Sequence, residues 1–168
     1  MTTTQDSTTK EQPWHASFPA PRTTEPQVVK REDLLAMFKS GNRRAGRDFL
    51  LVDVRRNDHE GGTIHSSLNL PAQSLYHSLP TLYTLATSTG VPLVIFYCGS
   101  CGGRGPRAAG WFADYIEDQT ATKPSDTSST VQSAILQGGV KGWVAGGEEY
   151  IKYMDGFEKG VWEKTTTT

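Results

Sequence analysis

The stretch that decides the fold is VPLVIFYCGSCGGRGPR, residues 91–107. Its first seven residues form a short apolar run, rich in β-branched and aromatic side chains, which is typical of a strand buried on both faces. The glycine-rich segment 98–104 predicts a loop, and Pro106 suits the first turn of a helix that we expect to extend through Glu117. Strand, loop and helix therefore follow one another, and Cys98 lies at the end of the strand.

The loop that begins at Cys98 predicts an oxyanion site. Backbone N–H groups and the positive end of the helix dipole would converge there and lower the pKa of the thiol. Arg104 adds a planar guanidinium that can hold two oxygens of a tetrahedral oxyanion. We therefore predict Cys98 as the nucleophile and Arg104 as the second catalytic residue. The predicted oxyanion-binding loop consists of Gly99, Ser100, Cys101, Gly102, Gly103 and Arg104. In the alternative, Cys98 is a buried, inert thiol that caps the strand.

Cys101 allows two further interpretations. Cys101 and Arg107 are also separated by five residues, but that loop would contain Pro106, which has no N–H to offer. The spacing from Cys98 to Cys101 is C-x-x-C. Cys101 is therefore a candidate resolving thiol that would close a disulfide with a modified Cys98. In the alternative it is a small filler, held too far from Cys98 for disulfide geometry.

Composition and charge limit the class of protein. The chain has 168 residues and a formal net charge of -1, with a pI near 6.4, so nothing favours nucleic acid or an anionic membrane as a partner. No stretch approaches the ~18 apolar residues that a membrane span needs. Two cysteines three positions apart indicate chemistry in a reducing compartment. We expect a cytoplasmic or nuclear protein without a bound metal or cofactor, and the sequence leaves its oligomeric state open.

The two ends of the chain differ in composition from its middle. Residues 1–25 predict a disordered or extended arm, residues 26–160 a single domain, and residues 161–168 a flexible tail. In the arm, Trp14 and Phe18 either dock on the domain or belong to a flexible leader.

Strand and helix patterns alternate along the domain. We expect strands at 49–54, 68–70, 91–97 and 131–136, helices at 31–40, 73–85 and 105–117, and terminal helical segments at 141–145 and 150–157. Residues 119–130 are polar and predict a surface loop. The alternation predicts an α/β fold with a central, mainly parallel sheet flanked by helices.

Further segments resemble the rhodanese-like superfamily. Residues 52–55 (VDVR), 60–64 (EGGTI) and 69–71 (NLP) look like its Asp-x-Arg strand, Gly-His-Ile turn and Asn-x-Pro exit. Residues 135–143 (ILQGGVKGW) are similar to its closing strand, double glycine and tryptophan. The resemblance runs from about residue 28 to 157 and implies a three-layer rhodanese-like fold.

The length of the loop separates branches of that superfamily. Five residues between Cys98 and Arg104 resemble the M-phase inducer phosphatases and the fungal and plant arsenate reductases, whereas sulfurtransferases usually have a loop one residue shorter. The resemblance implies an arsenate reductase, a phosphatase or both, acting on arsenate, phosphate or a phosphorylated substrate. Glutathione with glutaredoxin, or another thiol, would be the external reductant. The alternatives are a thiosulfate-type sulfurtransferase and a non-catalytic binding module. The family usually has His where this chain has Thr63 and Tyr97.

Proton delivery separates the two favoured reactions. An alkoxide or phenoxide leaving group needs a general acid, and residues 99–103 contain no carboxylate. Asp58, His59 and Glu60, which follow the strand at 49–54, could supply an acid from outside the loop, with Asp58 and Glu60 as the candidate carboxylic acids. In the alternative they form a solvated turn in which Glu60 pairs with an arginine.

Three more charged residues are expected to support the loop. Asp53 and Arg55 predict a buried ion pair that orders it. Arg107, on the first helical turn, either widens the positive field or pairs with Asp53.

Overall fold

The centre of the molecule is a five-stranded sheet. The computed structural model describes residues 11–122 and 131–165. The strand order is β1-β6-β5-β2-β4, and every neighbouring pair is parallel. The strands are β1 (Gln27–Val29), β2 (Leu50–Asp53), β4 (Ser67–Asn69), β5 (Leu93–Tyr97) and β6 (Gln132–Leu136). The strand that precedes the predicted loop, β5, is therefore the middle strand.

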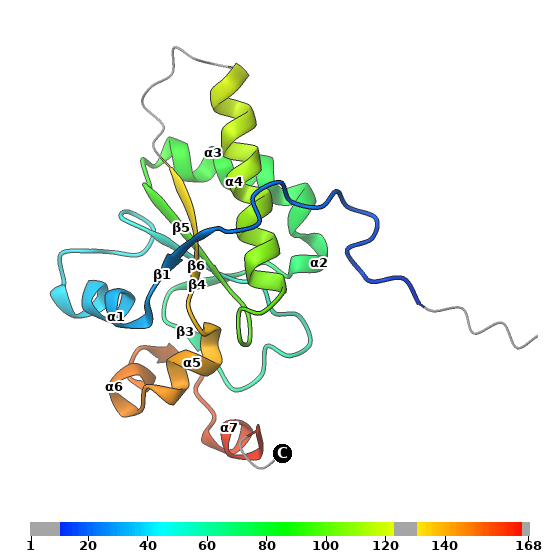
Figure 1. Ribbon diagram of the computed structural model, residues 1–168. Coiled ribbons are helices and arrows are strands. Elements are labelled where there is room, and N and C mark those ends of the chain that lie inside the picture. Colours follow the sequence, from blue (N-terminus) through cyan, green and yellow to red (C-terminus); the bar gives the residue numbers. More distant parts are fainter. Residues whose placement is uncertain (1–10, 123–130, 166–168) are drawn as a thin grey trace, which may run out of the picture.

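Helices cover both faces of this sheet (Figure 1). On one side lie α2 (Ala72–Leu75), α3 (Leu79–Ser88) and α4 (Arg104–Thr122), and on the other α1 (Arg31–Ser40), α5 (Gly139–Ala145) and α6 (Glu148–Ile151). The remaining elements are the 3-10 turn η1 (Tyr76–Ser78), the antiparallel pair β3 (Thr63–Ile64) and β7 (Met154–Asp155), and α7 (Lys159–Thr165). The predicted α/β fold, with a parallel sheet between two helical layers, is confirmed.

Strands β2 and β5 lie at the centre of the hydrophobic core. Leu51 and Val52 of β2, and Ile95 and Phe96 of β5, are fully buried, because helices cover both of their faces. Two-sided burial explains why these strands have continuous apolar runs instead of alternating patterns. Across the two described ranges, no helix has the length and apolar character that crossing a membrane would require.

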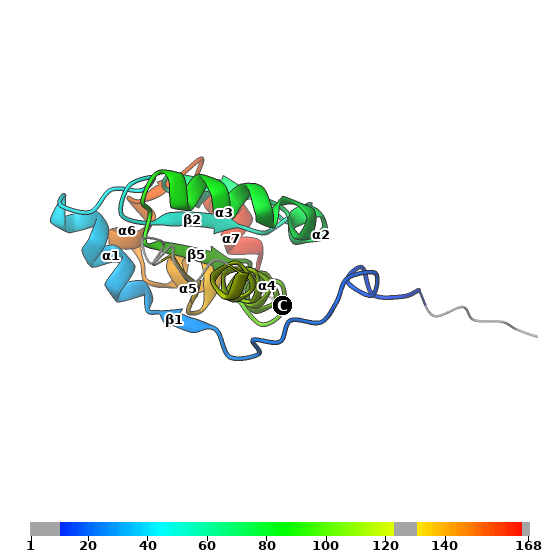
Figure 2. The same ribbon diagram turned by 90° about the horizontal axis from the view of Figure 1, so that it is seen from above.

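The N-terminal arm crosses α4 in Figure 1, and Figure 2 shows it in blue as it continues from β1. Trp111 of α4 donates from Nε1 to the carbonyl of Pro19 (2.8 Å). The Asp114 carboxylate accepts from the backbone N–H (3.0 Å) and the hydroxyl (2.8 Å) of Thr23. The ring of Phe18 meets that of Trp111 edge-on, with centroids 5.7 Å apart. The aromatic residues of the arm thus dock on the domain, while residues 1–10 lie outside the described part.

The C-terminal end differs from the sequence prediction. Residues 161–165, expected in a flexible tail, belong to helix α7. Trp162 donates from its indole Nε1 to the carbonyl of Gly61 (2.7 Å), and this contact anchors the helix on the domain. A contact across about a hundred residues leaves no local pattern in the sequence. Residues 166–168 lie outside the described part.

Two other boundaries also differ. The loop expected from residue 119 begins later, since α4 continues through Thr122. Thr120 and Thr122 donate from their hydroxyls to carbonyls four residues earlier (2.9 and 3.0 Å), which satisfies these polar side chains within the helix. Residues 123–130 lie outside the described part. The segment 150–157, expected to be helical, instead ends α6 and forms strand β7, which pairs with β3.

Candidate active site

Cys98 follows β5 directly, and the start of α5 holds it in place. The Val140 N–H donates to the Cys98 carbonyl (3.0 Å), and the Lys141 N–H donates to the Gly99 carbonyl (2.9 Å). Gly139 has a positive φ of 59°, and a Cβ there would overlap both carbonyls. The double glycine of the sequence therefore lets α5 approach the loop closely. The Cys98 side chain itself is buried, with 3% exposure.

The surroundings of Cys98 favour its thiolate. The neighbouring Cys101 thiol, the backbone N–H groups of Gly105 and Cys101, and the charge of Arg104 lower the pKa of Cys98 to about 5, against the opposing effect of burial. The Cys101 thiol makes the largest contribution. A thiol with this pKa is almost fully ionised at neutral pH, and the thiolate is the nucleophilic form of cysteine.

Titration of the protein should show this thiolate. Because the pKa of Cys98 is lowered from 9.0 to about 5, ultraviolet thiolate absorbance should disappear as the pH falls through about 5. The step should be absent in Cys98→Ser, and Cys101→Ala should move it to higher pH by removing the largest contribution. A step at the ordinary pKa of a free cysteine in the wild-type protein would contradict this electrostatic account.

The Arg104 guanidinium is paired with Asp58. Arg104 Nη1 donates to Asp58 Oδ1 (2.7 Å), and Nη2 donates to Oδ2. This pairing holds the pKa of Asp58 well below its usual range. The expected ion pair between Glu60 and an arginine is therefore wrong: Asp58 makes the pair, and Glu60 accepts from Arg55 Nη1 through its backbone carbonyl (3.4 Å). The sequence placed both acids beside the site but could not decide which one reaches across.

Asp53 and Arg55 form the predicted buried ion pair, which organises the loop after β2. Arg55 Nη2 donates to Asp53 Oδ2 (2.6 Å), with both side chains almost fully buried, and it also donates to the Gly62 carbonyl (2.8 Å). Asn69 Nδ2 donates to the carbonyls of Asp53 (3.0 Å) and Arg55 (2.9 Å). His59 points inward: its buried Nε2 lies 3.4 Å from Asp53 Oδ2 without forming a hydrogen bond.

Thr63 and Tyr97, which stand where the family resemblance leads us to expect histidines, contact each other. The hydroxyl of Tyr97 lies 2.8 Å from Thr63 Oγ1 and 2.6 Å from Ser67 Oγ, and it accepts from the Ile64 N–H (3.2 Å). Thr63 donates to Asp53 Oδ2 (2.9 Å), so Tyr97 is the donor to Thr63. Burial, with the nearby Asp53 charge, raises the pKa of Tyr97, which keeps this donor protonated. The two replacements therefore form one hydrogen-bonded unit that joins β5 to the turn at β3.

Arg107 lies over an aromatic ring of its own helix. Its guanidinium carbon lies 5.9 Å above the centre of the Trp111 ring, and the Asp53 carboxylate is taken by Arg55. The predicted alternative in which Arg107 pairs with Asp53 is therefore wrong. A cation above an aromatic face adds packing and local order to the first turns of α4.

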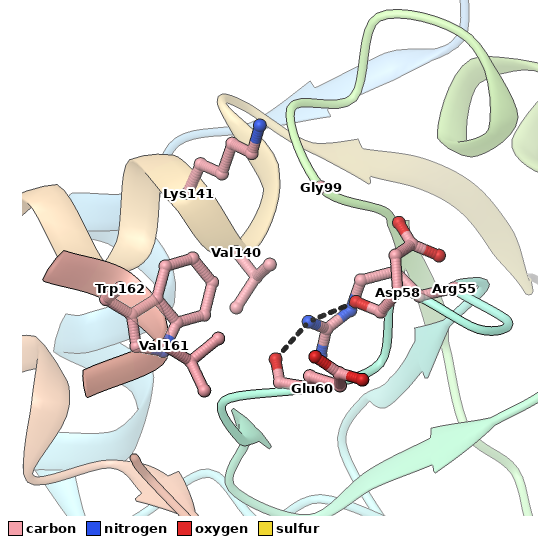
Figure 3. Close-up of a pocket in the computed structure, with 8 residues that line it drawn as sticks. All are labelled: Arg55, Asp58, Glu60, Gly99, Val140, Lys141, Val161 and Trp162. Carbon is pink, nitrogen blue, oxygen red and sulfur yellow. Dashed lines mark hydrogen bonds between the residues drawn. The ribbon is translucent and has the colours of Figure 1, made fainter. Parts of the chain in front are cut away.

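A pocket of about 270 Å³ opens beside the loop (Figure 3). It is lined by Arg55, Asp58, Glu60, Gly99, Val140, Lys141, Val161 and Trp162. Trp162 and Val161 form the wall that faces Asp58 and Arg55 across the opening. Sequence reasoning did not assign Lys141, Val161 or Trp162 to the site; the apolar pair 161–162 before a threonine tail was the available signal. Among residues 11–122 and 131–165, no group of three His, Cys, Asp or Glu residues could hold a metal ion.

The sequence is similar to an arsenate reductase from rice and an arsenical-resistance protein from yeast. No protein-family model matches the sequence. Arsenate reductase 2.1 of Oryza sativa subsp. japonica is 33% identical over 139 residues, which cover 79% of this chain and 76% of the relative. Arsenical-resistance protein 2 of Saccharomyces cerevisiae is 29% identical over 103 residues, 58% of this chain and 75% of the relative.

A solved structure has a fold similar to that of this chain. Saccharomyces cerevisiae Ygr203w, a homolog of single-domain rhodanese and the Cdc25 phosphatase catalytic domain, gives a TM-score of 0.63 at 23% identity. The match covers 81% of this chain and 91% of that chain. The chain therefore has a rhodanese-like fold, and it belongs to the family of the rice arsenate reductase.

Proposed function

We propose that this chain is an arsenate reductase in which the Cys98 thiolate attacks a bound arsenate. The observation that carries the proposal is a thiol with a pKa lowered to about 5, at the end of the middle strand and beside the Arg104 guanidinium. Backbone N–H groups of the loop and Arg104 would hold the oxygens of the oxyanion and neutralise their charge. The relationship to the rice arsenate reductase supports this choice of substrate.

The composition of the loop favours arsenate over a phosphate ester. An ester must expel an alkoxide or phenoxide, which needs a general acid unless the leaving group is good. Residues 99–103 contain no carboxylate, and among the candidate acids from outside the loop, Arg104 holds Asp58 in its ionised form. Arsenate can lose water with protons from its own oxygens and from solvent. The site therefore suits arsenate, and hydrolysis of aryl phosphates with good leaving groups is expected only as a weak second activity.

Parallel assays of the purified full chain test the proposal. We expect arsenite from arsenate with glutathione and glutaredoxin, weak hydrolysis of p-nitrophenyl phosphate, and negligible release of phosphate from phosphoserine or phosphothreonine peptides. The assay of thiosulfate with cyanide is the fourth arm. Thiocyanate formation without arsenite formation would overturn the proposal in favour of a sulfurtransferase. Inactivity of the folded protein in all four arms would favour a binding module.

Asp58→Asn should tighten the binding of oxyanions. In the structure the Asp58 carboxylate occupies both Nη groups of Arg104, which an oxyanion would also need. Half-exposed ion pairs contribute at most about 1 kcal/mol, so the inhibition constant of inorganic phosphate should fall by up to about fivefold. The measurement is phosphate inhibition of p-nitrophenyl phosphate hydrolysis.

Glu60→Gln provides the matched control for Asp58→Asn. It removes a carboxylate from the same loop, but Glu60 meets an arginine through its backbone carbonyl, so the phosphate affinity should change less. If Asp58→Asn instead reduced the hydrolysis of esters with poor leaving groups more than that of esters with good ones, Asp58 would be the general acid.

A further inference from the structure

The second cysteine of the loop, Cys101, has an unusual backbone conformation. Cys101 has a φ of 58°, in the left-handed region that side chains other than glycine rarely adopt. Its side chain is buried, with 9% exposure, whereas its neighbours Ser100 and Gly102 are exposed. The loop thus turns the Cys101 thiol inward, with its Sγ 3.9 Å from the carbonyl oxygen of Phe96 at the end of β5. Strained residues of this kind are often part of a functional site.

The two sulfurs of the loop share one space. A Cβ on Gly105 would lie 2.7 Å from Cys101 Sγ and 3.6 Å from Cys98 Sγ. Gly105 is in the first turn of α4 and is itself buried. Both thiols therefore face the same point, which only a glycine at this position leaves empty. The two sulfurs therefore lie close to each other, as a resolving role for Cys101 requires.

The protonation states of the two thiols set an order of events. The Cys98 thiolate and burial together raise the pKa of Cys101, so Cys101 stays a protonated thiol while Cys98 is free. Once Cys98 is bonded to arsenic, its negative charge is gone, and with it the largest cause of the raised pKa of Cys101. Cys101 then ionises more easily, at the stage when a second thiolate is needed.

We propose that Cys101 is the resolving thiol of arsenate reduction, which closes a disulfide with Cys98 and releases arsenite without a second protein or small thiol in that step. This role rests on the proposed arsenate reductase activity. It adds a catalytic residue and changes the part played by the external thiol, which would reduce the Cys98–Cys101 disulfide after product release.

The proposed reduction takes place in two bond-forming steps at the two cysteines of the loop. The Cys98 sulfur forms a bond to arsenic and displaces one arsenate oxygen, which leaves as water after protonation. The Cys101 sulfur then attacks the Cys98 sulfur and gives up its proton to an arsenite oxygen. The S–As bond breaks and its electron pair stays on arsenic, which is reduced from As(V) to As(III) while the two thiols are oxidised to a disulfide. An external thiol later supplies two electrons to restore both thiols.

A single-turnover experiment on the full chain tests this role. Reduced protein, freed of all other thiols, is mixed with arsenate under anaerobic conditions, and arsenite and free thiols are counted after unfolding. The chain has two cysteines, so the count is unambiguous. We expect about one arsenite per protein molecule and the loss of both thiols, with a Cys98–Cys101 disulfide in the peptide map. Inorganic phosphate in place of arsenate is the control for air oxidation and should leave both thiols free.

Two variants complete the test. Cys98→Ser, which keeps Cys101, should give neither arsenite nor thiol loss. Cys101→Ser should retain arsenic on Cys98 and release arsenite only when glutathione is added. If wild-type protein releases arsenite only with added glutathione and keeps both thiols without it, the role of Cys101 is overturned while the arsenate reductase proposal stands. If no arsenite forms even with glutathione and glutaredoxin, the arsenate reductase proposal itself fails.

Discussion

Cys98→Ser should abolish arsenate reduction and aryl phosphate hydrolysis together. A serine hydroxyl cannot be ionised appreciably by surroundings that lower the pKa of a thiol to about 5. Loss of an essential nucleophile typically costs about 1,000-fold or more in turnover. The change is nearly isosteric at a buried position, so the fold and oxyanion binding should survive. The measurement is the rate of arsenite formation, with binding of inorganic phosphate followed separately.

The turnover of Cys98→Ser can also contradict the assignment of Cys98 as the nucleophile. Turnover in Cys98→Ser above about a hundredth of the wild-type rate would rule out Cys98 as an essential nucleophile. A thermal unfolding curve close to that of the wild type shows that the loss belongs to the chemistry and not to folding.

Arg104→Lys should reduce turnover by about a hundredfold or more, although it preserves the charge. Arg104 uses both Nη groups at once toward Asp58, and we expect the same planar face to hold two oxygens of the substrate. Lysine offers a single point charge in its place. The measurement is kcat and KM for arsenate, with both parameters affected because the contact serves binding as well as the transition state.

Arg107→Lys is the matched control for this change. Arg107 lies over the Trp111 ring, a contact that lysine can also make, so turnover should change by less than about threefold. If Arg107→Lys proves more damaging than Arg104→Lys, the oxyanion cradle runs from Cys101 to Arg107 and the loop assignment is wrong.

Local sequence patterns predicted the strand, loop and helix around Cys98, and the structure contains all three. The continuous apolar run of β5 and Pro106 in the first turn of α4 are short-range signals, so the sequence alone could place Cys98 at the carboxyl end of a buried strand. The buried pair of Asp53 and Arg55 was equally accessible, because its members are two residues apart.

The contacts that the sequence could not predict join distant segments. Asp58 and Arg104 are 46 residues apart, and nothing in a single sequence distinguishes Asp58 from Glu60 as the partner. Trp162 reaches Gly61 across 101 residues, and no local pattern predicts this contact, so the sequence alone indicates a flexible tail where the structure has a helix. Thr63 and Tyr97 are 34 residues apart, and only the fold shows that their hydroxyls are hydrogen-bonded to each other.

The most direct test of the central claim is to find the atom that arsenate modifies. Wild-type protein is mixed with arsenate in thiol-free buffer, quenched rapidly, and analysed by intact mass and peptide mapping. The account predicts that Cys98 is modified in every reacted molecule, either bonded to arsenic or in a disulfide with Cys101. Arsenite formation with Cys98 unmodified, or arsenic mapped to Cys101 while Cys98 remains a free thiol, would contradict it.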